Sequence, residues 1–287
     1  MPSSNPPAPP PSRDRRRAHG AAPPALALAL LLAAAPAAAQ TDYYNTDAGR
    51  PITVEDAYPI ERRALEIQVA PLRLERARGG SYAWGIEPEV AVGLLPRTQL
   101  EVGFPLAYTD LGGGRRSTGL AGIEVAALHN LNVETTIPAL AVAGELLLPA
   151  GALGPERTHA SVKGIATKTF AWARLHLNGQ YTFGDEPDAA ADEGAHGGAE
   201  LWRWMGGLAV DRTLPLESLL LTAELVARQP LAEEADVRWD TAAGARYQLS
   251  PRVALDGGAG YRLTGDAGWF VTFGAAVSLG LPWSRGR

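Results

Sequence analysis

The stretch Arg174-Leu175-His176-Leu177-Asn178-Gly179-Gln180-Tyr181-Thr182-Phe183 alternates between two kinds of side chain. One set of alternate positions is apolar apart from a glycine, and the other set is charged or polar. Successive side chains of a β-strand point to opposite faces, so the stretch predicts a strand with one apolar and one polar face. Its length also suffices for a tilted strand to cross a bilayer. A soluble β-sandwich would accept such a strand equally well, so the rest of the chain has to decide.

Alternating segments of this kind recur along most of the chain. Twelve can be counted, and bacterial outer-membrane barrels have an even number of strands. Pro71 interrupts the first segment, because proline cannot donate a hydrogen bond to a sheet. The expected strands are 65–76, 81–94, 98–109, 118–129, 139–148, 158–169, 174–183, 201–211, 219–228, 237–249, 252–263 and 269–281.

The links between the segments alternate in length. Links that follow even-numbered segments are mostly short, as at Ser250-Pro251, whereas 110–117 and 184–200 on the opposite side are long and polar or Gly-rich. Short periplasmic turns that alternate with longer external loops are typical of outer-membrane barrels. The short links 77–80 and 264–268 depart from this pattern.

Large aromatic residues gather near the expected strand ends. Trp202, Trp204 and Trp269 are expected on the outer face near the external ends, and Trp172 and Tyr247 near the opposite ends. Such positions match the aromatic girdles at the two membrane–water interfaces of a barrel. In a soluble sandwich, large aromatics would pack mid-strand in the core. Together the three patterns predict an all-β fold, an antiparallel up-and-down transmembrane β-barrel; a soluble sandwich or propeller is the alternative.

The first forty residues predict export. Arg13, Arg15, Arg16 and Arg17 form a basic cluster, an Ala/Leu-rich run follows, and Ala37-Ala38-Ala39 offers a cleavage site. The apolar run is short for a membrane-spanning helix. The expected organisation is a signal peptide over 1–39, a polar segment over 40–64 that is periplasmic or lumen-packed, the barrel over 65–283, and a short C-terminal tail over 284–287.

Composition excludes several classes of protein. Without the four Arg and one Asp of the signal peptide, the formal net charge changes from −5 to −8, which argues against a nucleic-acid partner. The absence of Cys excludes disulfides and thiolate metal sites. We assign no cofactor. The partners that we expect are outer-membrane lipid and lipopolysaccharide, the barrel-assembly machinery and an unidentified small solute, in the outer membrane of the cell.

Three stretches carry a resemblance to a known family. Gly93-Leu94-Leu95 with 100–105, Leu175-His176-Leu177-Asn178, and 258–264 resemble the outer-membrane family described as "meta-pathway of phenol degradation", a group of putative transporters. Gly119–Ile123 matches less well, because the family commonly has Gly-Asp where Ala121-Gly122 stand. The resemblance implies a porin-like channel for small solutes, aromatic or hydrophobic compounds among them. Its motifs are turn and strand residues, so no functional residue is carried over.

Polar side chains on the inward face of the later strands are the candidate site. They would line a pathway for a small polar or aromatic-acid solute, or they would pair with one another in a structural barrel with a filled lumen. A plug formed by 40–64 would favour the filled lumen. Twelve strands fall between eight, which leave little interior space, and sixteen, which leave a channel. The candidate lumen-lining residues are Arg174, His176, Asn178, Arg203, Glu224, Arg228, Arg238, Asp240, Arg246, Arg252, Asp256 and Arg262.

Two further patterns suggest chemistry. His159-Ala160-Ser161, with Asn178 on the neighbouring strand, resembles the arrangement of an outer-membrane phospholipase. The acidic loop 185–193 would suit a divalent cation, although such a run is more often a solvated loop. We expect no enzyme and assign no catalytic or metal-binding residue. The strand orientation itself predicts that a charge at Leu177 costs about 2–4 kcal/mol at mid-bilayer, and that a charge at Asn178 costs far less.

Overall fold

The computed structural model describes residues 45–69, 72–77, 80–110, 114, 116–184, 201–231, 236–265 and 268–281. The expected signal peptide, the C-terminal tail and the acidic loop 185–193 lie outside these residues. Within them, no helix has the length and apolar character needed to cross a membrane.

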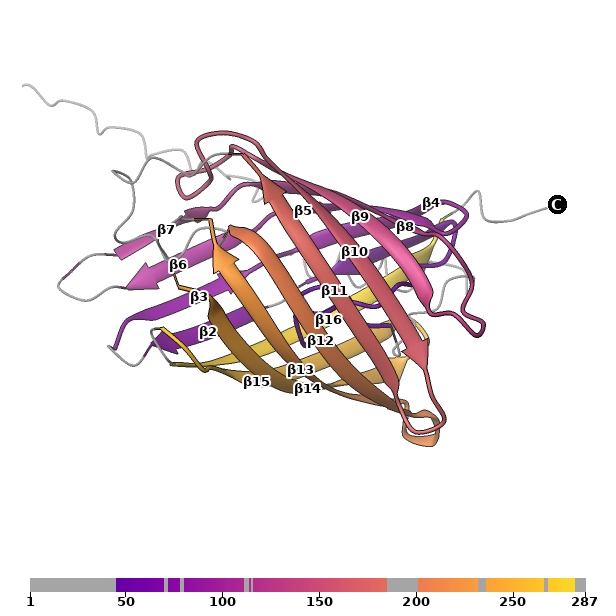
Figure 1. The fold of residues 1–287 in the computed structure, drawn as a ribbon. Helices are drawn as coiled ribbons and strands as arrows, with labels where there is room; N and C mark the ends of the chain where they lie inside the picture. Colours follow the sequence, from indigo (N-terminus) through magenta and orange to yellow (C-terminus); the bar gives the residue numbers. More distant parts are fainter. Residues whose placement is uncertain are drawn as a thin grey trace, which may run out of the picture. The chain divides into compact units, whose positions relative to one another are not determined.

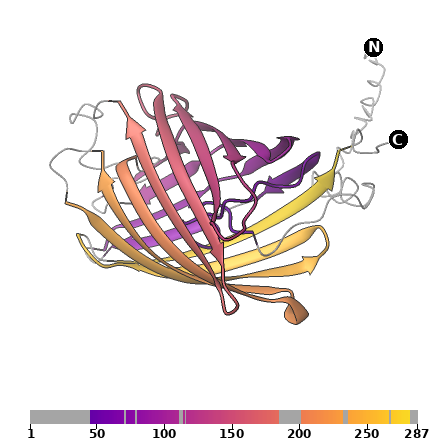
Figure 2. The same ribbon diagram turned by 45° about the vertical axis from the view of Figure 1, so that its right-hand side comes forward.

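In the described part of the chain, sixteen β-strands form one antiparallel sheet (Figures 1 and 2). Consecutive strands of the second half, from β8 to β16, are neighbours in the sheet. The strands are β1 Ala64–Gln68, β2 Leu72–Ala77, β3 Tyr82–Ile86, β4 Glu89–Leu95, β5 Thr98–Gly103, β6 Leu106–Asp110, β7 Arg116–Leu120, β8 Ile123–Asn130, β9 Ala139–Leu148, β10 His159–Thr169, β11 Arg174–Phe183, β12 Trp202–Leu214, β13 Leu219–Pro230, β14 Arg238–Ser250, β15 Val253–Arg262 and β16 Gly268–Gly280.

The sheet closes on itself as a barrel of twelve strands. The first eight elements are the halves of four longer strands, β1 with β2, β3 with β4, β5 with β6 and β7 with β8. The last strand, β16, pairs along one half with β1 and along the other with β2. Closure gives the backbone groups of the joined strands partners without water, which lipid demands of a spanning sheet. The expected antiparallel barrel is confirmed.

The breaks in the four N-terminal strands line up in one row. Phe104 donates its backbone N–H to Pro88 O (3.0 Å), and Ala121 donates to Pro105 O (2.8 Å), so each break is bonded to the next. Pro88 and Pro105 interrupt the ladder because they lack an N–H group. Gly122, with φ +122°, occupies the corresponding position of the fourth strand. Of these breaks, only the first, at Pro71, was predicted from the sequence.

The outer face is apolar, and aromatic residues mark its two ends. Leu177, in the middle of β11, is 58% exposed. Trp204 and Trp269 are exposed near one end of the barrel, and Trp172 and Tyr247 are exposed near the other. This is the arrangement of a surface that meets lipid between two interfaces.

Trp202 is an exception, and the prediction that it faces outward is wrong. Trp202 pairs with Pro230 and Trp204 pairs with Gln229, so the strand carries a β-bulge between the two tryptophans. The extra residue reverses the alternation. Trp202 therefore lines the lumen and lies under the Arg228 guanidinium, 5.1 Å from the ring centroid.

Candidate functional site: the barrel lumen

Residues 45–60 lie inside the barrel, and we call this segment the plug. It forms no strand, and its backbone is bonded instead to side chains of the wall. Thr53 and Val54 donate their N–H groups to Glu224 Oε2 (2.8 and 2.9 Å). Asn178 holds Glu55 through two bonds, accepting from its N–H (3.0 Å) and donating to its carbonyl oxygen (2.8 Å). The inward polar side chains thus replace the sheet partners that the plug lacks.

Further along, the plug is bonded to the strands on the other side of the barrel. Ala57 donates its N–H to Thr167 Oγ1 (3.0 Å), and its carbonyl oxygen accepts from Asn130 (2.8 Å). Ile60 donates its N–H to Gln99 Oε1 (2.7 Å). The bonded wall residues come from β5, β8, β10, β11 and β13, so the plug crosses the lumen.

Glycines in the wall make room for the plug. A Cβ on Gly207 would lie 2.5 Å from Val54 Cγ2, and a Cβ on Gly244 would lie 2.7 Å from Pro51 Cβ. Val54 is fully buried, in a cluster with Met205 and Val226. Because glycine has no side chain, it admits this close approach.

Most of the charged side chains that β11 to β16 turn inward are paired with one another or with the plug. Asp211, for example, lies between Arg174 and His176 at full burial. We call this inner surface the paired wall. Its contacts include Arg174–Asp211 (2.6 Å), His176–Asp211 (2.9 Å), Arg174–Asp56 (3.6 Å), Arg262–Asp240 (3.4 Å), Arg228–Asp240 (3.5 Å), Arg246–Asp47 (2.9 Å), Arg50–Asp47 (2.6 Å) and Arg50–Asp256 (3.6 Å).

The candidate residues of the sequence fall mostly into this network. Nine of them bind the plug, one another or Asp211, namely Arg174, His176, Asn178, Glu224, Arg228, Asp240, Arg246, Asp256 and Arg262. Arg203 donates to the carbonyl oxygens of Thr182 and Gly184 where β11 ends, and Arg238 lies 5.7 Å from the ring centroid of Trp202. Arg252 lies at the opposite end, beside Ser250. Of the twelve, Arg228 alone lines the cavity described below.

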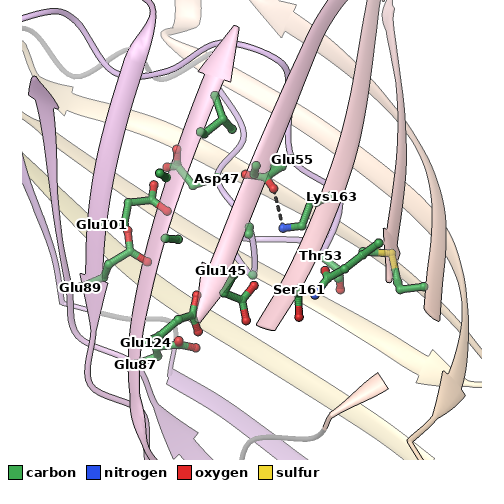
Figure 3. A pocket seen from close by; sticks show the side chains of 18 of the residues that line it. Asp47, Thr53, Glu55, Glu87, Glu89, Glu101, Glu124, Glu145, Ser161 and Lys163 are labelled. Carbon is green, nitrogen blue, oxygen red and sulfur yellow. Dashed lines mark hydrogen bonds and ion pairs between the residues drawn. The ribbon is translucent and has the colours of Figure 1, made fainter. Parts of the chain in front are cut away.

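The opposite inner surface is acidic, and we call it the acidic wall. It is formed by β4, β5, β8 and β9, whose inward positions make two neighbouring rows across the strands. One row reads Ala91, Glu101, Ala126, Glu145 and the other reads Glu89, Gly103, Glu124, Leu147. Glutamate therefore alternates with a small or apolar residue, and the two rows are offset by one strand. Glu87, from the break between β3 and β4, lies beside Glu124 (Figure 3).

A cavity of about 260 Å³ lies between the plug and the acidic wall (Figure 3). The five glutamates of the wall face it, together with Asp47 and Glu55 of the plug. Its basic lining is Lys163 of β10 and Arg228 of β13. Lys163 is bonded to Glu55 (2.5 Å), and Arg228 pairs with Asp240 (3.5 Å).

The sequence interpretation missed these glutamates, although the alternation places them. With Val90 and Val92 facing outward, Glu89 has to face inward, and the same holds for Glu101 and Glu124 beside their apolar neighbours. The inward orientation of Glu145 could not be predicted, because both faces of β9 are rich in Ala and Leu. Among the described residues, no group of three or more His, Asp or Glu is placed to hold a metal ion.

The residues suggested for a phospholipase are not brought together. Ser161 bonds with Thr182 (2.9 Å), and Asn178 is occupied by Glu55. Asn178 pairs with Ile165, roughly 20 Å along β10 from His159 at the usual rise per residue. His159 Nδ1 is buried without a hydrogen-bond partner in the described residues, so no bond joins it to Ser161. The phospholipase arrangement is therefore wrong.

One contact ties the plug to the link between β8 and β9. Tyr58 donates its hydroxyl to Glu134 (3.1 Å), which also accepts from the Thr169 N–H (2.7 Å) and lies 3.2 Å from Lys168. Burial and the Glu134 charge raise the pKa of Tyr58 to about 12. Partial burial opposes ionisation of Glu134, but its hydrogen bonds outweigh that effect and lower its pKa.

Solved structures of known proteins resemble this barrel. The COG4313 outer membrane channel from Pseudomonas putida F1 superposes with a TM-score of 0.53 at 14% identity, over 82% of this chain and 100% of that one. The fold is that of an outer-membrane β-barrel. The KdgM porin (TM-score 0.46, 11% identity, 74% of this chain and 98% of that one) and the NanC porin (0.47, 8%, 74% and 98%) are similar more distantly.

No protein-family model and no curated protein matches the sequence. The phenol-pathway resemblance therefore stays a prediction. The outer-membrane barrel fold, in contrast, follows from the closed sheet and its apolar exterior.

Proposed function

We propose that the protein is an outer-membrane channel that passes small solutes through the lumen beside the plug. The observation that carries the proposal is the cavity of about 260 Å³ inside a closed barrel. A barrel with only a structural role has no need of ionisable side chains around an interior space, where they are costly. The outer face would contact lipid and lipopolysaccharide, and insertion would depend on the barrel-assembly machinery.

A structural barrel with a filled lumen is the second candidate, and the plug favours it. The hydrogen bonds of Thr53, Glu55 and Ala57 anchor the plug across the lumen, and the paired wall leaves little space on its side. The two candidates differ in one measurable property. A channel conducts with the plug in place, whereas a filled barrel conducts only after the plug has been displaced.

Reconstitution into planar bilayers tests the proposal. We expect step currents from the refolded protein, and swelling of liposomes loaded with small sugars or amino acids. Absence of both would contradict the channel. Step currents that occur only in a variant with a displaced plug would establish the filled barrel instead.

The finer proposal concerns the solute. The family resemblance implies aromatic or hydrophobic compounds, and uptake of a radiolabelled phenol against a radiolabelled sugar would test it. The charged lining of the cavity gives no support to an aromatic acid, because the carboxylates of the acidic wall repel an anion.

A further inference from the structure

We infer that the open part of the lumen selects cations, and that its solutes are small cations, inorganic or organic. This inference rests on the proposed channel function. It depends on two separate observations: a cavity inside the barrel, and carboxylates that face the cavity with no basic side chain in ion-pair contact.

The first step is the charge balance of the cavity. Asp47 is neutralised by Arg50 and Arg246, and Glu55 by Lys163. The cavity-lining basic residue that remains, Arg228, is paired with Asp240. The five glutamates of the acidic wall are thus left with no basic side chain within ion-pair distance in the described part of the chain.

The second step is the state of these carboxylates. Within the described residues, Glu89 and Glu145 make no hydrogen bond and no ion pair. Glu101 accepts a hydrogen bond from Gln99, a neutral group, and Glu87 shares a hydrogen bond with Glu124. All five lie on the inner surface of a barrel whose outside is lipid. An isolated carboxylate is costly in such a place, so protons or mobile cations have to neutralise it.

The third step is the spacing. Glutamates in the two offset rows lie diagonally across neighbouring strands, where Cβ atoms are about 7–8 Å apart. That spacing does not surround one bare metal ion, in agreement with the absence of a three-ligand cluster among the described residues. It offers several separate weak sites along one side of a cavity. Rings of carboxylates act in this way in cation channels, where binding must be weak enough for release.

The test is the reversal potential of the reconstituted protein in a KCl gradient, followed by replacement of KCl with methylammonium chloride and with sodium benzoate. We expect a reversal potential close to that of potassium, a sustained methylammonium current and no benzoate current. In the double variant Glu89→Gln/Glu145→Gln, the permeability ratio of K⁺ to Cl⁻ should fall roughly tenfold, the lower end of the focusing expected from a like-charged cleft.

Two variants serve as controls. Glu156→Gln removes one carboxylate from an exposed external position and should leave the ratio unchanged. Glu89→Asp/Glu145→Asp keeps the charge and should retain the selectivity. If single-channel currents occur but are unselective or anion-selective, or if the glutamine variant keeps the wild-type ratio, the inference fails and the channel stands. If no currents occur, both fail.

Discussion

The two inner surfaces of the barrel differ in how their acidic side chains are neutralised. On the paired wall, Asp211 and Asp240 lie between basic groups, and Glu224 accepts hydrogen bonds from the backbone of the plug. On the acidic wall, glutamates are separated by Ala91, Ala126 and Gly103, and they face a cavity. Charged side chains inside a barrel therefore do not by themselves indicate a solute pathway. Carboxylates that face a cavity without a basic partner do.

The difference also separates structural from functional polar residues. A buried pair that loses one partner leaves an uncompensated charge, which is strongly destabilising. A carboxylate without a partner of opposite charge already destabilises the folded state, so its removal should not lower the free energy of unfolding. The four predictions below use this contrast, from the largest expected effect to the smallest.

Loss of a carboxylate from the paired wall should have the largest effect. Asp211→Asn removes the buried carboxylate that Arg174 and His176 share and leaves Asp56, 3.6 Å from Arg174, as the remaining counter-charge, so we expect the free energy of unfolding to fall by about 3 kcal/mol or more. Denaturant unfolding of the protein in lipid vesicles measures this change. A loss below about 1 kcal/mol would show that the pairs are no more than exposed contacts.

On the outer face, a charge should destabilise the strands of both walls by the same amount. Leu177 of β11 and Leu140 of β9 lie in one lateral row, joined through Ala166, and both are exposed. Leu177→Arg and Leu140→Arg should each lower the free energy of unfolding by about 2–4 kcal/mol, because both place a charge in lipid. Leu216→Arg, in the turn before β13, is the control and should cost about 0–1 kcal/mol. Unequal costs at Leu177 and Leu140 would contradict a common depth in the membrane.

Displacement of the plug should have an intermediate effect. Gly207→Leu places a side chain on Val54 of the plug, and overpacking of this kind costs about 1–3 kcal/mol. The chain has no Cys, so a cysteine introduced at buried Ile52 reports plug exposure through its rate of reaction with a maleimide. We expect faster labelling in the Gly207→Leu background. Gly206→Leu, which has nothing within 4 Å, is the matched control and should leave the rate unchanged.

Removal of one carboxylate from the acidic wall should have the smallest effect and the opposite sign to Asp211→Asn. Glu145→Gln deletes a charge without a partner in the described residues, so the free energy of unfolding should rise, or change by less than about 1 kcal/mol. The same vesicle unfolding experiment compares the two variants directly. A loss as large as that of Asp211→Asn would mean that Glu145 has a counter-charge after all.

The sequence was sufficient to predict the barrel because each strand repeats one local rule. The apolar side of β11 or β13 has to face lipid, so alternation alone gives its strands and their orientation. The bulge before Trp204 was not predicted, because the alternating pattern of the sequence does not show where one extra residue is inserted.

The lumen was predictable only in part, because its contents depend on contacts far apart in the chain. Arg174 and Asp211 could be placed inward, but their pairing depends on strand register. The expectation that a charge at Asn178 costs far less than one at Leu177 ignored the plug. Asn178 is 2% exposed and binds Glu55 through both its amide atoms. The free-energy cost of a charge at this position therefore depends on its contacts with the plug.

The contacts of the plug have a consequence for the order of assembly. Val54 and Glu224 are 170 positions apart, and Pro51 and Thr272 are 221 apart. The first part of the plug therefore finds these two partners only when the last strands exist. Contacts of such long range slow folding, since the closure of large loops precedes any gain from them. Pro51 and Val54 therefore stay without these partners until the last strands are made, and the pairing of β16 with β1 completes the barrel around them.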